Sequence, residues 1–148
     1  FIGSGLFNLK EAKSPAHPIA VGLGSDVGAG TSFSMLKTMS AAYKVTQLQK
    51  QTLSPLQAFY LATLGGAKAI HLDSYIGNFK VGKESDFIVL NWQATPLMAF
   101  RHPQHSIESV EKLNEILFSL MILGDDRSID ATYIGGNLAY CNRDYMTW

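Results

Sequence analysis

The sequence predicts an α/β chain, in which one buried strand leads into helices and further short strands surround a single long helix. A β-branched apolar run at residues 19–23, flanked by proline and glycine, favours a buried strand. Apolar residues then recur at helical spacing, most clearly over residues 109–123. Because one strand cannot form a sheet alone, we expect the strand at 19–23 to pair with strands outside this chain.

The first half of the chain is expected to be mainly helical. Residues 5–13 predict a short helix with Leu6, Phe7 and Leu9 facing inward, interrupted by Pro15 and Pro18. After the strand, Thr31 or Ser32 is the expected N-cap of a helix that runs to about Gln49.

A second helix is expected to begin with Ser54 as N-cap and Pro55 at its first position. Its predicted inner face consists of Leu56, Phe59, Tyr60 and Thr63. Gly65 and Gly66 are expected to break or kink this helix, and residues 67–72 to resume it.

The second half combines strands with one long helix. Residues 86–91 are rich in strand-forming side chains, and residues 94–106, with two prolines, are expected to form a loop. A stripe of apolar residues predicts an amphipathic helix at 109–123 that Gly124 ends. The segments 129–134 and 137–140 predict a hairpin around Gly135 and Gly136.

Composition narrows the class of protein. In 148 residues, 12 basic and 12 acidic side chains cancel, so no charge imbalance points to nucleic acid or an anionic membrane as a partner. No apolar run reaches the roughly 18 residues of a membrane helix. The single cysteine, Cys141, favours a reducing compartment, so we expect a cytoplasmic protein. The chain starts with Phe1, as an excerpt from a longer protein would.

The most informative feature is Asp26, which follows the expected strand and opens a glycine-rich turn. The carboxyl end of a strand is where α/β enzymes gather their reacting groups. Glycines at 24, 28 and 30 allow a ligand to approach the backbone closely. From spacing alone, however, such an aspartate is more often a cap of the next helix than a chemical group.

Other polar residues have structural interpretations. His102 and His105 lack a cysteine or carboxylate between them, so we do not expect them to bind metal. His17 is expected in a loop, and His71 is expected at the end of a helix. Ser32 and Ser34 are interpreted as caps, and Cys141 as a small apolar residue. The residues 125–127 predict a helix stop with a surface ion pair.

Several stretches resemble the metal-dependent amidohydrolases. Residues 24–32 and 34–36, Gly-Ser-Asp-Val-Gly-Ala-Gly-Thr-Ser and Ser-Met-Leu, resemble the eighth barrel strand and its following loop. Residues 76–77 and 82–90 resemble the signature that returns the chain to a small β-sandwich. Residues 117–127, with 1–9 and 94–97, are similar to the guanine deaminase subgroup.

The resemblance implies a fold, which is the C-terminal fragment of a (β/α)₈ barrel with part of an accessory β-sandwich. Residues 1–72 would hold the last barrel units with strand eight and its flanking helices. Residues 73–148 would hold the C-terminal part of the sandwich and one long helix.

The resemblance also implies a function, the zinc-dependent hydrolysis of guanine to xanthine and ammonia in purine catabolism. Asp26 would bind the zinc and handle the proton of its water, and no other ligand of the family has a counterpart here. The segment alone is therefore expected to be inactive and metal-free. The resemblance identifies no purine-contacting residue, and it implies a homodimer.

Two alternatives stay open at this point. The chain could belong to another deaminase or chlorohydrolase of the same superfamily that acts on a different heterocycle. It could also be a non-catalytic fragment whose apolar surface binds a partner chain, because the charged fraction of 16% is low.

Overall fold

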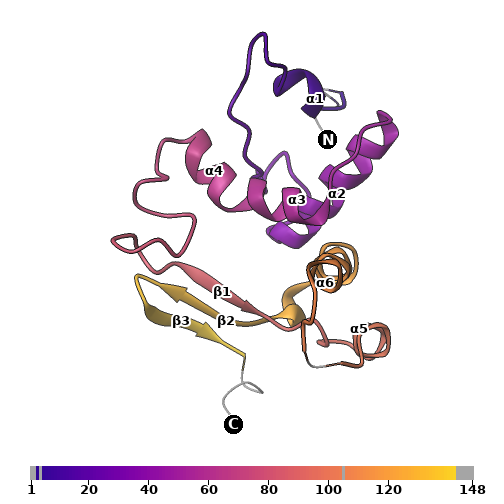
Figure 1. The fold of residues 1–148 in the computed structure, drawn as a ribbon, viewed down its shortest axis with the longest axis vertical. Coiled ribbons are helices and arrows are strands. Elements are labelled where there is room, and N and C mark those ends of the chain that lie inside the picture. The colour runs from indigo at the N-terminus through magenta and orange to yellow at the C-terminus, as the bar shows by residue number, and fades with distance from the viewer. Residues whose placement is uncertain (1–2, 4, 105, 143–148) are drawn as a thin grey trace.

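The computed structural model describes residues 3, 5–104 and 106–142. Four helices occupy one side of the molecule, a three-stranded sheet lies opposite, and two further helices flank the end of the sheet (Figure 1). The elements in chain order are α1 (Leu9–Ala12), α2 (Met35–Leu48), α3 (Pro55–Ala62), α4 (Leu64–Ala69), β1 (Phe87–Leu90), α5 (Pro96–Arg101), α6 (Val110–Leu123), the 3₁₀ turn η1 (Asp126–Ser128), β2 (Ile129–Ile134) and β3 (Asn137–Cys141). No helix in these described ranges has the length and apolar character needed to cross a bilayer.

The segment that precedes Asp26 is extended, but it is not a strand of a sheet. Ile19 is exposed, and the amide of Leu23 donates to the carbonyl of Leu61 on α3 at 2.9 Å. Ile19 is thus not buried within this chain, whereas the strand at 19–23, whose partners are expected outside the chain, stays a prediction. None of the described strands forms a ladder with this segment.

The N-terminal helix is also shorter than the expected one. α1 begins only after Asn8, whose side chain accepts a hydrogen bond from the amide of Glu11 at 3.1 Å. Leu9 is buried as expected, but Leu6 and Phe7 are exposed because they precede the helix. Their predicted inward orientation is wrong.

Helix boundaries follow the capping side chains. Ser34, not Thr31 or Ser32, is the N-cap of α2, and Gln49 is its C-cap, as the apolar spacing indicates. Ser54 and Pro55 begin α3 as predicted. The helical path is interrupted at Thr63, which has φ −126° and ψ −103°. Gly65 and Gly66 lie inside α4, so the break that the sequence predicts at these glycines is misplaced.

The predicted inner face of α3 is partly wrong. Ala58 and Leu61 are buried on α3, whereas Leu56 and Tyr60 are exposed. The buried face is the one that meets α2 and α6, both of which contact α3.

The hydrophobic core lies between α2, α3 and α6. It joins residues from both halves of the chain: Leu36 and Met39 on α2, Leu61 on α3, Ile116, Leu120 and Met121 on α6, and Met98 on α5. The edge-on contact of Tyr43 with Phe118, at 5.4 Å between ring centroids, extends it. Consequently α6 supports α2, the helix that follows the Asp26 turn.

The sheet is antiparallel throughout, in the order β1-β2-β3. Phe87 on β1 pairs with Tyr133 on β2, and their rings stack with centroids 4.5 Å apart. Gly135 and Gly136 have φ values of +56° and +78°, the conformation that a tight hairpin turn requires. The strand at 86–91 and the C-terminal hairpin are thus confirmed.

Helix α5 is a correction to the loop expected at 94–106. Thr95 is its N-cap, accepting from the amide of Met98 at 3.3 Å, and Pro96 is its first residue. A serine or threonine followed by proline also marks the start of α3 in the sequence. At α5 this start signal is hard to recognise, because residues 94–106 contain two prolines and show no regular apolar period. His105 lies outside the described residues.

Candidate active site

The turn that carries Asp26 is closed by its own backbone. The carbonyl oxygen of Asp26 accepts hydrogen bonds from the amides of Ala29, at 3.1 Å, and Gly30, at 2.5 Å. Asp26 itself has φ +45°, a left-handed conformation that aspartate tolerates better than most residues. A side chain at position 30 would lie 1.9 Å from the carbonyl oxygen of Ser25, so only glycine fits there. The chain thus turns sharply at the residue that carries the Asp26 carboxylate.

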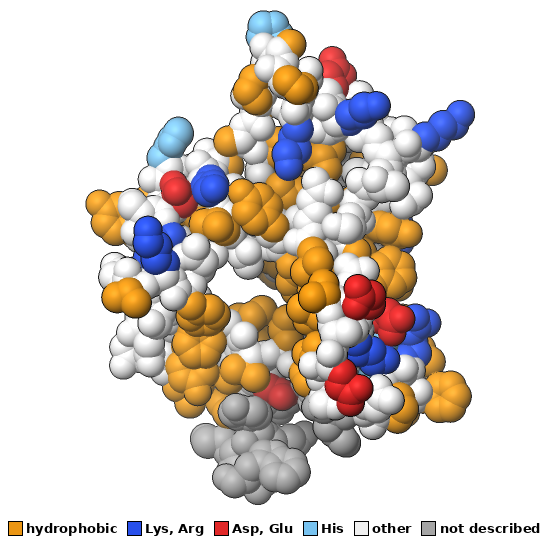
Figure 2. All heavy atoms as spheres, viewed as in Figure 1, with side chains coloured by type: hydrophobic (Ala, Val, Ile, Leu, Met, Phe, Trp, Pro, Cys, Tyr) orange, Lys and Arg blue, Asp and Glu red, His pale blue; other side chains and the backbone are white. Residues whose placement is uncertain are grey.

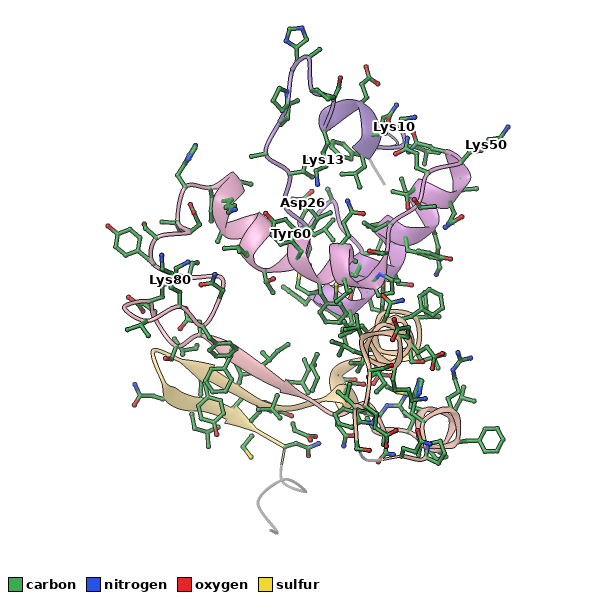
Figure 3. All side chains as sticks on the ribbon, in the orientation of Figure 1. Lys10, Lys13, Asp26, Lys50, Tyr60 and Lys80 are labelled. Carbon is green, nitrogen blue, oxygen red and sulfur yellow. The ribbon has the colours of Figure 1, made fainter. Side chains whose placement is uncertain are left out.

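The Asp26 side chain is exposed and lines a pocket of about 440 Å³. Figure 3 shows Asp26 on the connection between α1 and α2. An added Cβ at Gly24 or Gly28 would meet no atom within 4 Å, so the space around the turn is open. The carboxylate is therefore available to a ligand.

The opposite wall of this pocket comes from the first turns of α2. Lys37, Thr38 and Ala41 line it, together with Thr31 and Ser32 from the turn. The hydroxyl of Ser34 caps α2 by accepting from the amide of Lys37 at 3.4 Å, and the hydroxyl of Ser32 accepts from the amide of Ser34 at 3.0 Å. Sequence reasoning missed Lys37 and Thr38 as pocket residues, although their spacings of four and three residues from Ala41 could have placed them on one helix face.

A larger hollow of about 880 Å³ adjoins the same segment. It lies between residues 22–24, helix α4 and strand β1, where Figure 2 shows an opening in the surface. Gly24 lines both cavities. An added Cβ at Gly22 would come within 2.6 Å of the Cα of Gly66, so position 22 must be glycine for the extended segment to lie on α4.

Asp26 is not joined by further metal ligands in the described part of the chain. No group of three or more His, Cys, Asp or Glu side chains there is arranged to hold a metal ion. His17 is exposed in its loop, and His71 follows the C-cap of α4 with φ +59°. His102 is buried and its Nε2 lies 2.7 Å from the hydroxyl of Ser119.

The remaining polar candidates have structural roles. The Nε atom of Arg127 donates to Oδ1 of Asp125 at 3.0 Å and its Nη2 donates to Oδ2 at 2.6 Å, and the two side chains form the surface ion pair that the sequence predicts. This guanidinium lowers the pKa of the Asp125 carboxyl chiefly through the hydrogen bond. Cys141 is half-buried and its thiol lies 3.3 Å from the carbonyl of Asn142.

Residues 2–139 match the model of the amidohydrolase family. The chain belongs to the amidohydrolase family. It is 54% identical to a guanine deaminase of Escherichia coli K12 over 140 residues, which cover 95% of this chain and 30% of the relative. The chain thus spans about a third of the length of the curated relatives it matches.

Solved structures of this amidohydrolase family agree with the sequence comparison. The structure of E. coli guanine deaminase matches with a TM-score of 0.83 and 53% identity, over 97% of this chain and 32% of that one. A guanine deaminase of C. acetobutylicum with bound guanine in its active site matches with a TM-score of 0.72 and 27% identity, over 94% of this chain and 31% of that one. The similarity to guanine deaminases therefore includes both halves of the chain.

Proposed function

We propose that this chain is the C-terminal part of a zinc-dependent guanine deaminase, and that Asp26 is a metal ligand and a proton-transfer group in it. The proposal rests on the membership of the amidohydrolase family and on the similarity to guanine deaminases. The structural observation that supports it is the exposed Asp26 carboxylate on a backbone-closed turn beside an open pocket.

Asp26 fits one position in the coordination shell of a zinc ion. A carboxylate oxygen is a normal zinc ligand, and the neighbouring glycines leave room for an ion to reach it. Three or four ligands are needed, and the described residues group no others with Asp26. The imidazole ligands would therefore come from a part of the protein outside this chain.

When bound, zinc would supply a hydroxide at neutral pH by lowering the pKa of water from about 15.7 to about 7. In this proposal, the Asp26 carboxylate accepts a proton from the water and later donates it to the departing amino group. The turn holds the backbone of Asp26 through two amides, which limits the positions that its carboxylate can take.

The proposed reaction balances as a hydrolysis. The water oxygen bonds to the purine carbon that bears the exocyclic amino group, and the carbon–nitrogen bond breaks. The nitrogen leaves as ammonia with the proton carried by Asp26, and guanine becomes xanthine.

The test is ammonia release by the intact protein with guanine, cytosine and a triazine as separate substrates. Release from guanine at least a hundredfold faster than from the other two supports the proposal. Preference for another heterocycle would assign the protein to a different deaminase or chlorohydrolase activity. No release from any of them, with a zinc-free protein, would favour a non-catalytic role.

The finer points of the architecture belong to the same proposal. Residues 1–72 would complete a (β/α)₈ barrel as its last units, and residues 73–148 would form part of an accessory β-sandwich. A homodimer and a cytoplasmic location also stay proposals, the latter resting on the lone Cys141.

A further inference from the structure

His102 is a buried titratable side chain that the proposed reaction does not use. It is 2% exposed and lies at the C-terminal end of α5, against α6. Its Nε2 atom is 2.7 Å from the hydroxyl of Ser119, which is equally buried. Because neither side chain reaches solvent, the pair cannot meet a substrate as a nucleophile and its base.

The other ring nitrogen of His102 has no partner in the described part of the protein. Nδ1 is buried, and no hydrogen bond to it is present there. A neutral imidazole can leave Nδ1 as a bare acceptor at a moderate cost in free energy. An imidazolium would instead place a charged N–H donor at a position with no acceptor, which costs considerably more.

The charges that face His102 act in the same direction. Arg101 on α5 and Lys112 on α6 are cations, and Glu115, the one facing carboxylate among the described residues, is engaged by Lys112 at 3.3 Å. Gln93, in the loop before α5, contacts His102 only through a neutral amide that donates to its backbone carbonyl at 2.6 Å. Burial, followed by the charges of Lys112 and Arg101, lowers the pKa of His102 from its ordinary value of 6.5.

Helix α5 has few other attachments. Met98 is fully buried in the core, whereas Phe100 is 83% exposed and Leu97 is 56% exposed. His102 caps this helix, since its amide donates to the carbonyl of Met98 at 3.0 Å. The six-residue helix is therefore held mainly by Met98 and by the His102–Ser119 pair, and losing one of these contacts would free a large part of it.

We propose that His102 and Ser119 form an acid-sensitive latch, which holds α5 on α6 while the imidazole is neutral and releases α5 when the ring is protonated. In the released state the ring is in water with its ordinary pKa of 6.5. The latch is therefore fully effective above about pH 6.5. It weakens as the pH falls below that value, by up to tenfold in the opening equilibrium per pH unit.

The test is hydrogen exchange by mass spectrometry on the intact protein, with rates corrected for the intrinsic pH dependence of exchange. Between pH 6.5 and pH 5.5, protection of the α5 amides is expected to fall up to about fivefold, while protection of β2 stays constant. His102→Gln keeps an amide that can reach Ser119 but cannot titrate in this range, so its α5 protection is expected to be independent of pH. Ser119→Ala is expected to lower α5 protection at both pH values.

Two results would overturn the latch. One is α5 protection that does not change with pH in the unmodified protein, and the other is an equal decline in His102→Gln. If that variant does not fold, the ring of His102 in the unmodified protein can be titrated by NMR with labelled histidine. A midpoint below 6.5 supports the latch, and a midpoint at or above 6.5 contradicts it.

Discussion

The amide of Gly30 donates to the carbonyl oxygen of Asp26 at 2.5 Å and closes the turn that presents the candidate metal-binding carboxylate. Position 30 has no room for a Cβ, because that atom would lie 1.9 Å from the carbonyl oxygen of Ser25. The conformation of Asp26 thus depends on a residue four positions away that carries no chemistry of its own.

Gly30→Ala is therefore expected to open this turn. The clash is with backbone, which cannot move aside as a flexible side chain would, so a cost of about 1–3 kcal/mol in the free energy of unfolding is expected. Urea denaturation of the intact protein measures it. Gly24→Ala is the matched control for stability, since its added Cβ meets nothing within 4 Å. Equal stability losses in the two variants would contradict the steric argument.

Met98→Ala tests the attachment of α5 to the core. Met98 is fully buried, and removing its side chain is expected to destabilise the protein by about 2–5 kcal/mol. Leu97→Ala, one position earlier on the same helix, is expected to change stability by less than about 0.5 kcal/mol, because Leu97 is largely exposed. Thermal unfolding distinguishes the two. A larger loss for Leu97→Ala would mean that another surface covers α5 in the intact protein.

Arg127→Gln tests the worth of the ion pair with Asp125. Although the geometry is bidentate, Arg127 is largely exposed, so only a small loss of stability is expected, and it should shrink in high salt. Arg127 lowers the pKa of Asp125 below its ordinary value of 3.8, so the pair stabilises the fold above that pH. Its contribution is lost as the pH falls through the lowered pKa. Unfolding free energies at pH 7 and pH 3 in both proteins check this, and a larger loss at pH 3 would contradict it.

The sequence was sufficient to predict the elements that have strong local signals. Ser54 and Pro55 begin α3, the apolar stripe and Gly124 bound α6, and Gly135 and Gly136 form the hairpin. Each of these features depends on a few adjacent residues and on physical chemistry that acts locally.

The parts that sequence reasoning missed depend on tertiary context. Ile19 was expected to be buried but is exposed, because the strands expected to cover it lie outside this chain. The face that α3 buries is set by α2 and α6, not by its own apolar spacing. The sequence indicates Asp26 as a candidate because it follows an apolar run and precedes glycines. Lys37 and Thr38 line the same pocket only because α2 folds back on the turn.

The most direct test of the account is the zinc content of intact Asp26→Asn, measured beside its rate of ammonia release from guanine. Asparagine keeps the size of the side chain but removes its charge, so bound zinc is expected to fall well below one equivalent and the rate by about 10²–10⁴-fold. Glu84→Gln, which neutralises another exposed carboxylate, should retain both zinc and rate. An Asp26→Asn protein with full zinc and an unchanged rate would contradict the assignment of Asp26.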